Sequence, residues 1–130
     1  MGIKQVLETC LYVDDLEAAE AFYQNVLELN LYSKQANRHL FFSLESQMLL
    51  LFKSESTLKK ETLPTHGTIG PGHVAFGVEQ SEIETWEKKL IDKKIEIELV
   101  HRWPNGVSSI YFRDPAGNSI EITNKSIWDL

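Results

Sequence analysis

Hydrophobic and polar positions in the first half of the chain predict one strand, one helix and three further strands. Residues 6–13 alternate between apolar and polar side chains, which indicates a strand with one apolar face. Asp14 and Glu17 fit a helix N-cap and its partner, and apolar residues then recur every three or four positions. We therefore expect a helix that ends near Asn30. Three short strands are expected to follow, at residues 31–35, 38–44 and 48–53.

The same order of elements recurs after a polar segment that contains prolines and glycines. A strand is expected at residues 72–78, and a helix that opens on a capping box of Ser81 and Glu84 comes next. Further strands are expected at residues 95–101, 107–112 and 118–123, with a turn at 114–117 between the last two. The chain therefore contains two repeats of the same order of elements: one strand, one helix and three strands.

This repeat predicts an α+β fold of two βαβββ modules whose mixed sheets curl around a shared cleft. The modules are placed at residues 4–53 and 72–124, with a linker at 54–71 and a C-terminal tail at 125–130. Within the two helices, the spacing of apolar residues predicts Phe22 and Trp86 as core anchors and puts Leu90 and Ile91 on the same buried face.

Composition narrows the class of protein. The chain has 130 residues, of which 42% are hydrophobic and 25% charged, as expected of one folded domain. A net charge of −6 argues against nucleic acid as a partner. The longest apolar run, residues 48–52, is far shorter than the roughly 20 residues of a membrane span. Because Cys10 is the only cysteine and no secretory leader is seen, we expect a cytoplasmic protein and treat Cys10 as structural filler.

Three ionisable residues, Glu8, His73 and Glu121, lie inside otherwise apolar strands. In each strand the large apolar residues have the opposite parity, so all three side chains are expected on the face that the helices leave open. Two carboxylates and one imidazole that converge are a common ligand set for a divalent metal ion. Taken one at a time, each residue fits an ordinary role better than metal binding: a solvated carboxylate for either glutamate, and a hydrogen-bonded core residue for the histidine.

A second group of residues suggests contacts with a substrate. Arg102 and Trp103 precede a Pro-Asn-Gly turn, where an arginine at the rim of a cavity would hold an anionic group. The alternative is an ordinary exposed hairpin end. We also place Tyr111 among the substrate contacts. His39 and His66 lie at edge or loop positions and are expected to be solvated.

Three segments resemble the vicinal oxygen chelate superfamily, which includes glyoxalase I, fosfomycin-resistance transferases, extradiol dioxygenases and bleomycin-resistance proteins. They are E-T-C-L-Y-V-D-D-L-E-A-A-E-A-F-Y-Q-N-V-L-E-L, G-H-V-A-F-G-V and D-P-A-G-N-S-I-E-I. The resemblance covers residues 4 to 124 and keeps the three segments in the family's order.

The resemblance implies metal ligands on the first and last strands of the modules. By position these are Glu8, where the family more often has His or Gln, together with His73 and Glu121. The fourth position falls on residues 48–51, which hold only Met and Leu, so the chain departs from the four-ligand glyoxalase I pattern. Two carboxylates and one histidine suit Mn, Ni, Zn or Mg better than Fe(II), which favours two histidines and one carboxylate.

By the same resemblance, the chain is expected to be a metal-dependent enzyme for a small molecule with two adjacent oxygens. The chemistry would be that of a lyase, isomerase or transferase, with Glu121 as metal ligand, general base or both in turn. The alternative is a binding protein of the bleomycin-resistance kind, which sequesters its ligand without a metal. Relatives of this length also imply a homodimer, with sites shared between the two chains.

Overall fold

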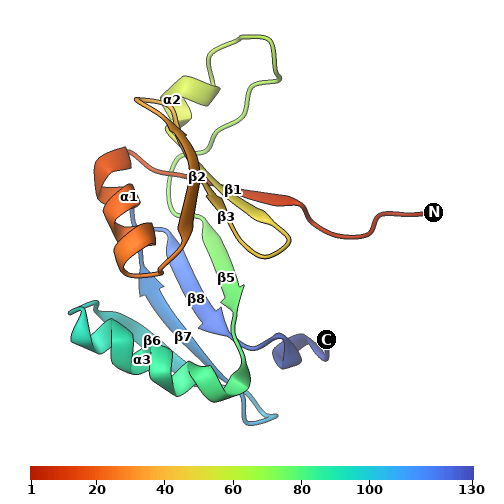
Figure 1. The fold of residues 1–130 in the computed structure, drawn as a ribbon, viewed down its shortest axis with the longest axis vertical. Helices are drawn as coiled ribbons and strands as arrows, with labels where there is room; N and C mark the ends of the chain where they lie inside the picture. The colour runs from red at the N-terminus through yellow and green to blue at the C-terminus, as the bar shows by residue number, and fades with distance from the viewer. The chain divides into compact units, whose positions relative to one another are not determined.

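The computed structural model describes residues 1–130 and divides them into two compact units, Met1–Gly70 and Pro71–Leu130 (Figure 1). Each unit contains one four-stranded mixed sheet and the helices packed on it. The expected α+β fold with two βαβββ modules is therefore confirmed. The two sheets are separate, since hydrogen bonds between strands run only within each unit.

In the first unit the sheet order is β1-β4-β3-β2, with β1 parallel to β4 and the other pairs antiparallel. Its elements are β1 (Glu8–Tyr12), α1 (Leu16–Asn25), β2 (Asn30–Gln35), β3 (His39–Ser43), β4 (Met48–Phe52) and the short α2 (Ser54–Thr57). Helix α1 contacts β3 and buries Ala19, Phe22 and Tyr23. The segment expected to be only a linker thus carries a helical turn, whose Thr57 is buried.

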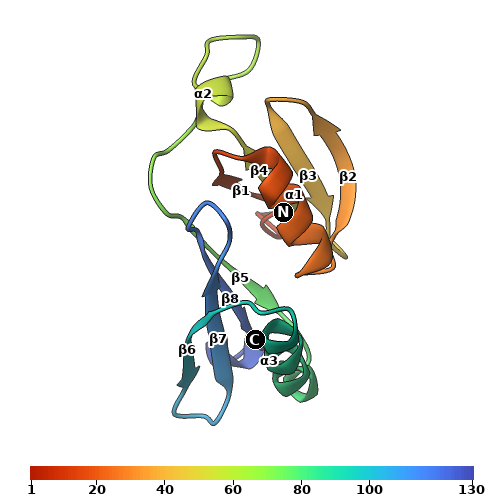
Figure 2. The same ribbon diagram turned by 90° about the vertical axis from the view of Figure 1, so that its left-hand side faces the viewer.

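The second unit repeats the order as β5-β8-β7-β6, again with one parallel pair, β5 and β8. Its elements are β5 (His73–Gly77), the 3-10 turn Gln80–Glu82, α3 (Ile83–Asp92), β6 (Ile97–Arg102), β7 (Ser108–Arg113), β8 (Ser119–Thr123) and the 3-10 turn Lys125–Trp128. Helix α3 lies along the sheet (Figure 2) and contacts β7 and β8. The residues Ile110, Phe112, Ile120 and Ile122 are at most 1% exposed and form this core.

Both helix starts differ from the expected ones. Asp15 caps α1 by accepting a hydrogen bond from the Ala18 N–H, so Asp14 is not the cap. The helix ends at Asn25 instead of near Asn30, and Glu28 then adopts a left-handed conformation with φ 59°. Before α3, the capping box is formed by Glu79 and Glu82 in place of Ser81 and Glu84.

The apolar face of α3 is narrower than its sequence indicates. Leu90 is fully buried, but Ile91 is 58% exposed. Trp86 is only half-buried, and the Lys89 ammonium lies 4.7 Å from the centre of its ring. Trp86, expected as a core anchor, is therefore not fully buried, and its indole lies beside the partly buried Lys89 of the same helix. Phe22, at 7% exposure, is buried as expected.

No helix of the structure has the length and apolar character that crossing a lipid bilayer requires.

Leu90 and Ile91 provide a matched test of this helix face. Leu90→Ala should lower the free energy of unfolding by about 2–5 kcal/mol, because it opens a cavity in the core of the second unit. Ile91→Ala should change it by less than about 0.5 kcal/mol, because that side chain is largely in water. Urea unfolding followed by circular dichroism measures both. Equal losses in the two variants would show that the helix packs on a different face.

Candidate functional site

The second sheet brings two of the expected site residues into contact. Glu121 on β8 is a register partner of Ala75 on β5 and of Tyr111 on β7, so it lies in the middle of the sheet. Its side chain is 7% exposed, whereas that of His73, at the start of β5, is 51% exposed. The His73 Nε2 atom lies 3.3 Å from Glu121 Oε1. A buried carboxylate therefore faces an imidazole that remains open to solvent.

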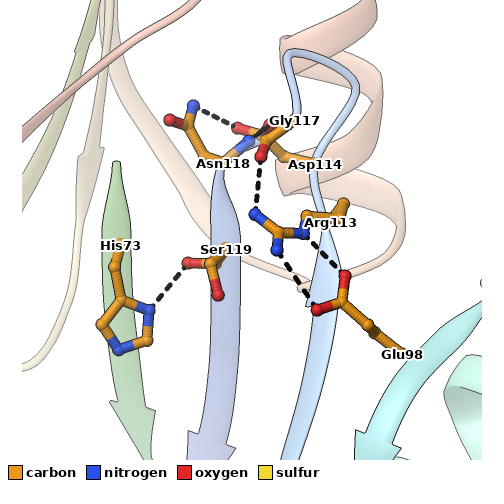
Figure 3. Close-up of polar contacts among 7 residues, drawn as sticks. All are labelled: His73, Glu98, Arg113, Asp114, Gly117, Asn118 and Ser119. Atoms are coloured by element: carbon orange, nitrogen blue, oxygen red, sulfur yellow. Dashed lines mark hydrogen bonds and ion pairs between the residues drawn. The ribbon is translucent and has the colours of Figure 1, made fainter. Parts of the chain in front are cut away.

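The orientation of the His73 imidazole is fixed by the contact that its second nitrogen, Nδ1, makes. His73 Nδ1 lies 3.0 Å from the Ser119 carbonyl oxygen (Figure 3). A carbonyl only accepts hydrogen bonds, so Nδ1 carries a proton and donates. In the neutral ring Nε2 then presents its lone pair to the Glu121 carboxylate. Two electron-rich atoms at this separation repel each other unless a proton or a cation lies between them.

The other oxygen of Glu121, Oε2, is buried and has no hydrogen-bond partner. A buried anionic oxygen without a partner is costly, and such groups in native structures commonly mark a ligand site. One imidazole nitrogen and one carboxylate fit the ligand preferences of Zn²⁺, Mn²⁺ and Ni²⁺. Neither unit by itself gathers three or more His, Cys, Asp or Glu side chains that could hold a metal ion.

Tyr111 lies beside this pair on β7, with its ring centroid 6.5 Å from that of His73. Burial raises the pKa of the Tyr111 phenol, and so does the negative charge of Glu121. A hydrogen bond to Glu121 also raises the pKa of the phenol, whereas a hydrogen bond with Ser109 lowers it. The phenol therefore stays protonated at neutral pH and is a hydrogen-bond donor.

Trp103 is tied to the same strand, because its indole Nε1–H donates to Ser109 Oγ at 2.8 Å. Ser109 is fully buried. Ser109 was not among the residues expected at the site, although its position two residues before Tyr111 puts both on one face of the strand. Arg102, the last residue of β6, is exposed and forms no ion pair.

Glu8 belongs to the first unit, where it lies exposed at the start of β1. It borders a pocket of about 590 Å³ whose floor is largely apolar and includes Cys10 and Phe52. Arg38 and Lys59 also line this pocket. The Arg38 guanidinium lies 5.4 Å from the centre of the Phe52 ring.

The two histidines of the first unit differ in their surroundings. His39 is only 8% exposed and stacks on Phe41 with ring centroids 3.9 Å apart, so the expectation that it is solvated was wrong. Burial, followed by the charge of Arg38, lowers the pKa of His39. His66 is exposed, yet its Nδ1 lies 2.6 Å from the Tyr12 hydroxyl.

The sequence of the chain matches the Glyoxalase/Bleomycin resistance protein/Dioxygenase superfamily over residues 2–122. The chain belongs to this superfamily. Among curated proteins, the glyoxalase-superfamily chain is 30% identical to a protein named metallothiol transferase FosB from Bacillus licheniformis, over 99% of this chain and 79% of the relative. A second FosB, from Lysinibacillus sphaericus, is 28% identical over 99% of this chain and 88% of its own length.

Among solved structures, a lactoylglutathione lyase from Agrobacterium tumefaciens superposes with a TM-score of 0.95. It is 39% identical to this glyoxalase-superfamily chain, and the alignment covers 99% of both chains.

The reactivity of the Cys10 thiol should depend on the charge of Glu8. Burial, followed by the charge of Glu8, raises the pKa of the Cys10 thiol, so less reactive thiolate is present at a given pH. Cys10 should therefore react slowly with iodoacetamide near neutral pH, with a rate that rises only in more alkaline solution. Glu8→Gln should shift this pH–rate profile toward lower pH, because it removes the negative charge that raises the pKa of the thiol.

The control is Glu61→Gln, which removes a different carboxylate from the lining of the same pocket. An unchanged profile in Glu8→Gln, or an equal shift in Glu61→Gln, would contradict a specific effect of Glu8 on the thiol.

Proposed function

We propose that this protein is a metal-dependent enzyme that acts on a small molecule with two adjacent oxygen atoms. The observation that carries the proposal is the buried Glu121 carboxylate, which has one oxygen without a partner and the other 3.3 Å from His73 Nε2. The similar proteins named metallothiol transferase and lactoylglutathione lyase support an enzyme of transferase or lyase type.

We assign one divalent metal ion to His73 Nε2 and the Glu121 carboxylate, with Glu8 as a third ligand on the grounds of the sequence. Mn²⁺, Ni²⁺, Zn²⁺ and Mg²⁺ fit this donor set, and Fe²⁺ fits it less well. When bound, such an ion acts as a Lewis acid that stabilises negative charge on a substrate oxygen.

The side chains around this pair have distinct roles in the proposal. Tyr111, as a neutral phenol, donates a hydrogen bond to a substrate oxygen, and Glu121 moves a proton when its carboxylate is free to do so. Arg102 is exposed and unpaired, so its guanidinium is available for an anionic group of the substrate. Trp103 forms an apolar contact beside it.

Metal titration tests the assignment directly. Wild-type protein should bind about one Mn²⁺, Ni²⁺ or Zn²⁺ per chain in calorimetric titrations. His73→Ala and Glu121→Gln should each weaken binding by about 10-fold or more, since each removes a donor atom. His101→Ala removes an exposed histidine on β6 of the same unit and serves as the control. Wild-type protein that binds no metal but does bind small ligands would favour the sequestering function instead.

We also propose that the protein is a homodimer whose metal sites take Glu8 from one copy and His73 and Glu121 from the other. Light scattering should give twice the chain mass. Glu8→Ala and His73→Ala chains, each defective alone, should regain about a quarter of the wild-type metal sites when refolded together, because about half of the dimers are mixed and each mixed dimer has one intact site. The reason is that a shared arrangement collects both lesions in one site and leaves the second intact. No recovery would show that each site is built from one chain.

A further inference from the structure

A buried polar pair organises the turn between β7 and β8. Asp114 is 4% exposed and Asn118 is 1% exposed. The Asn118 Nδ2 atom donates to Asp114 Oδ2 at 2.9 Å, and the Asn118 N–H donates to Asp114 Oδ1 at 2.8 Å (Figure 3). The Ala116 N–H donates to the same Oδ1 atom at 3.0 Å. Asp114 therefore fixes the Asn118 side chain in one orientation.

The carbonyl oxygen of the Asn118 side chain contacts the backbone just before β5. Its Oδ1 atom accepts a hydrogen bond of 2.7 Å from the N–H of Gly72, which is 46 residues away in the sequence. Gly72 is the residue before His73. Its carbonyl oxygen in turn accepts a hydrogen bond of 2.9 Å from the Ser119 N–H. Both sides of Gly72 are thus held by two consecutive residues, Asn118 and Ser119.

The same end of β8 also holds the His73 ring, because Nδ1 donates to the Ser119 carbonyl at 3.0 Å. The backbone before His73 and the imidazole itself are therefore fixed to Asn118 and Ser119. This places Nε2 at 3.3 Å from Glu121 Oε1, two residues further along β8.

The first unit shows that this connection is not a requirement of the topology. There Glu8 pairs with Met48 as His73 pairs with Ser119, and the Met48 N–H donates to the Leu7 carbonyl at 2.8 Å. Gln47 occupies the place of Asn118, but its side chain forms no hydrogen bond to Leu7. The side-chain bridge occurs in the second unit, before His73, and not at the equivalent place before Glu8.

We propose that Asn118 is a positioning residue, held in place by Asp114, that fixes Gly72 and thereby sets the His73 imidazole opposite Glu121. The proposal rests on the proposed function, since His73 and Glu121 are the pair that it serves. Asn118 acts through hydrogen bonds to the backbone and does not itself provide a ligand.

Exchanging the two side chains gives the sharpest test. Asn118→Asp keeps an acceptor for the Gly72 N–H but sets two carboxylates against each other, so the orientation of the side chain should be lost. The double variant Asp114→Asn/Asn118→Asp restores one amide and one carboxylate, and with them both the internal hydrogen bond and the acceptor for Gly72. Arg113→Gln is the matched control, because Arg113 braces the same turn through the Gly117 carbonyl at 3.0 Å and otherwise pairs with Glu98 on β6.

Two measurements need no metal ion. In Asn118→Asp, hydrogen exchange of the Gly72 amide should accelerate by about 10-fold or more, while amides in the middle of β8 keep their protection. The ¹⁵N shifts of the His73 ring, recorded at about pH 8.5 where a free histidine is neutral, should move away from the Nδ1-protonated pattern. The double variant and Arg113→Gln should both resemble wild type.

The third measurement is the affinity for Mn²⁺ in calorimetry, which should fall about 10-fold in Asn118→Asp and recover in the double variant. Wild-type ring shifts in Asn118→Asp, or an equal loss of affinity in Arg113→Gln, would overturn the proposal. If wild-type protein binds no Mn²⁺, the proposed function fails, while the exchange and ring-shift data still decide the role of Asn118. Should Asn118→Asp fail to fold, the folded double variant must show both wild-type signatures, and their loss would equally overturn the proposal.

Discussion

The burial of the Glu121 carboxylate is the constraint around which the second unit is arranged. The strand alternation that sends Ile120 and Ile122 into the core under α3 also sends Glu121 to the opposite face, in the middle of the sheet. A carboxylate with so little contact with water needs partners. His73 and Tyr111 lie against it from the strands on either side, and one of its oxygens is left without any partner.

Several other polar groups buried in the second unit are fixed by specific hydrogen bonds. Besides the pair Asp114 and Asn118, Thr123 donates to the Ser108 carbonyl at 3.0 Å, and Ser109 accepts from Trp103. Buried polar groups that are fully bonded make a structure rigid and specify one arrangement of its core. A site that must hold an imidazole and a carboxylate at a set distance benefits from such rigidity, because small displacements of donor atoms weaken a metal site or a proton transfer.

Local patterns in the sequence were sufficient for the order of elements and for the face on which His73 and Glu121 lie, because alternation and helical spacing depend only on near neighbours. They failed where the packing of the folded unit decides how far a side chain is buried or which group it contacts. Trp86 has the spacing of a core residue but is only half-buried, and His39 has the position of an edge residue but stacks on Phe41. Asn118 could be read only as the first residue of the last strand, since its partner Gly72 is 46 residues away.

The comparison of the two units shows where the chemistry of the fold resides. Their strands pair in the same pattern, so Glu8 corresponds to His73, Met48 to Ser119 and Leu50 to Glu121. In the first unit the position of the buried carboxylate is taken by a leucine, which lines the pocket that Glu8 borders. In the second unit the same position is ionisable and is supported by a network of hydrogen bonds. One topology thus carries a leucine at this position in one unit and a buried carboxylate in the other, and the difference comes from a few side chains at equivalent positions rather than from the backbone.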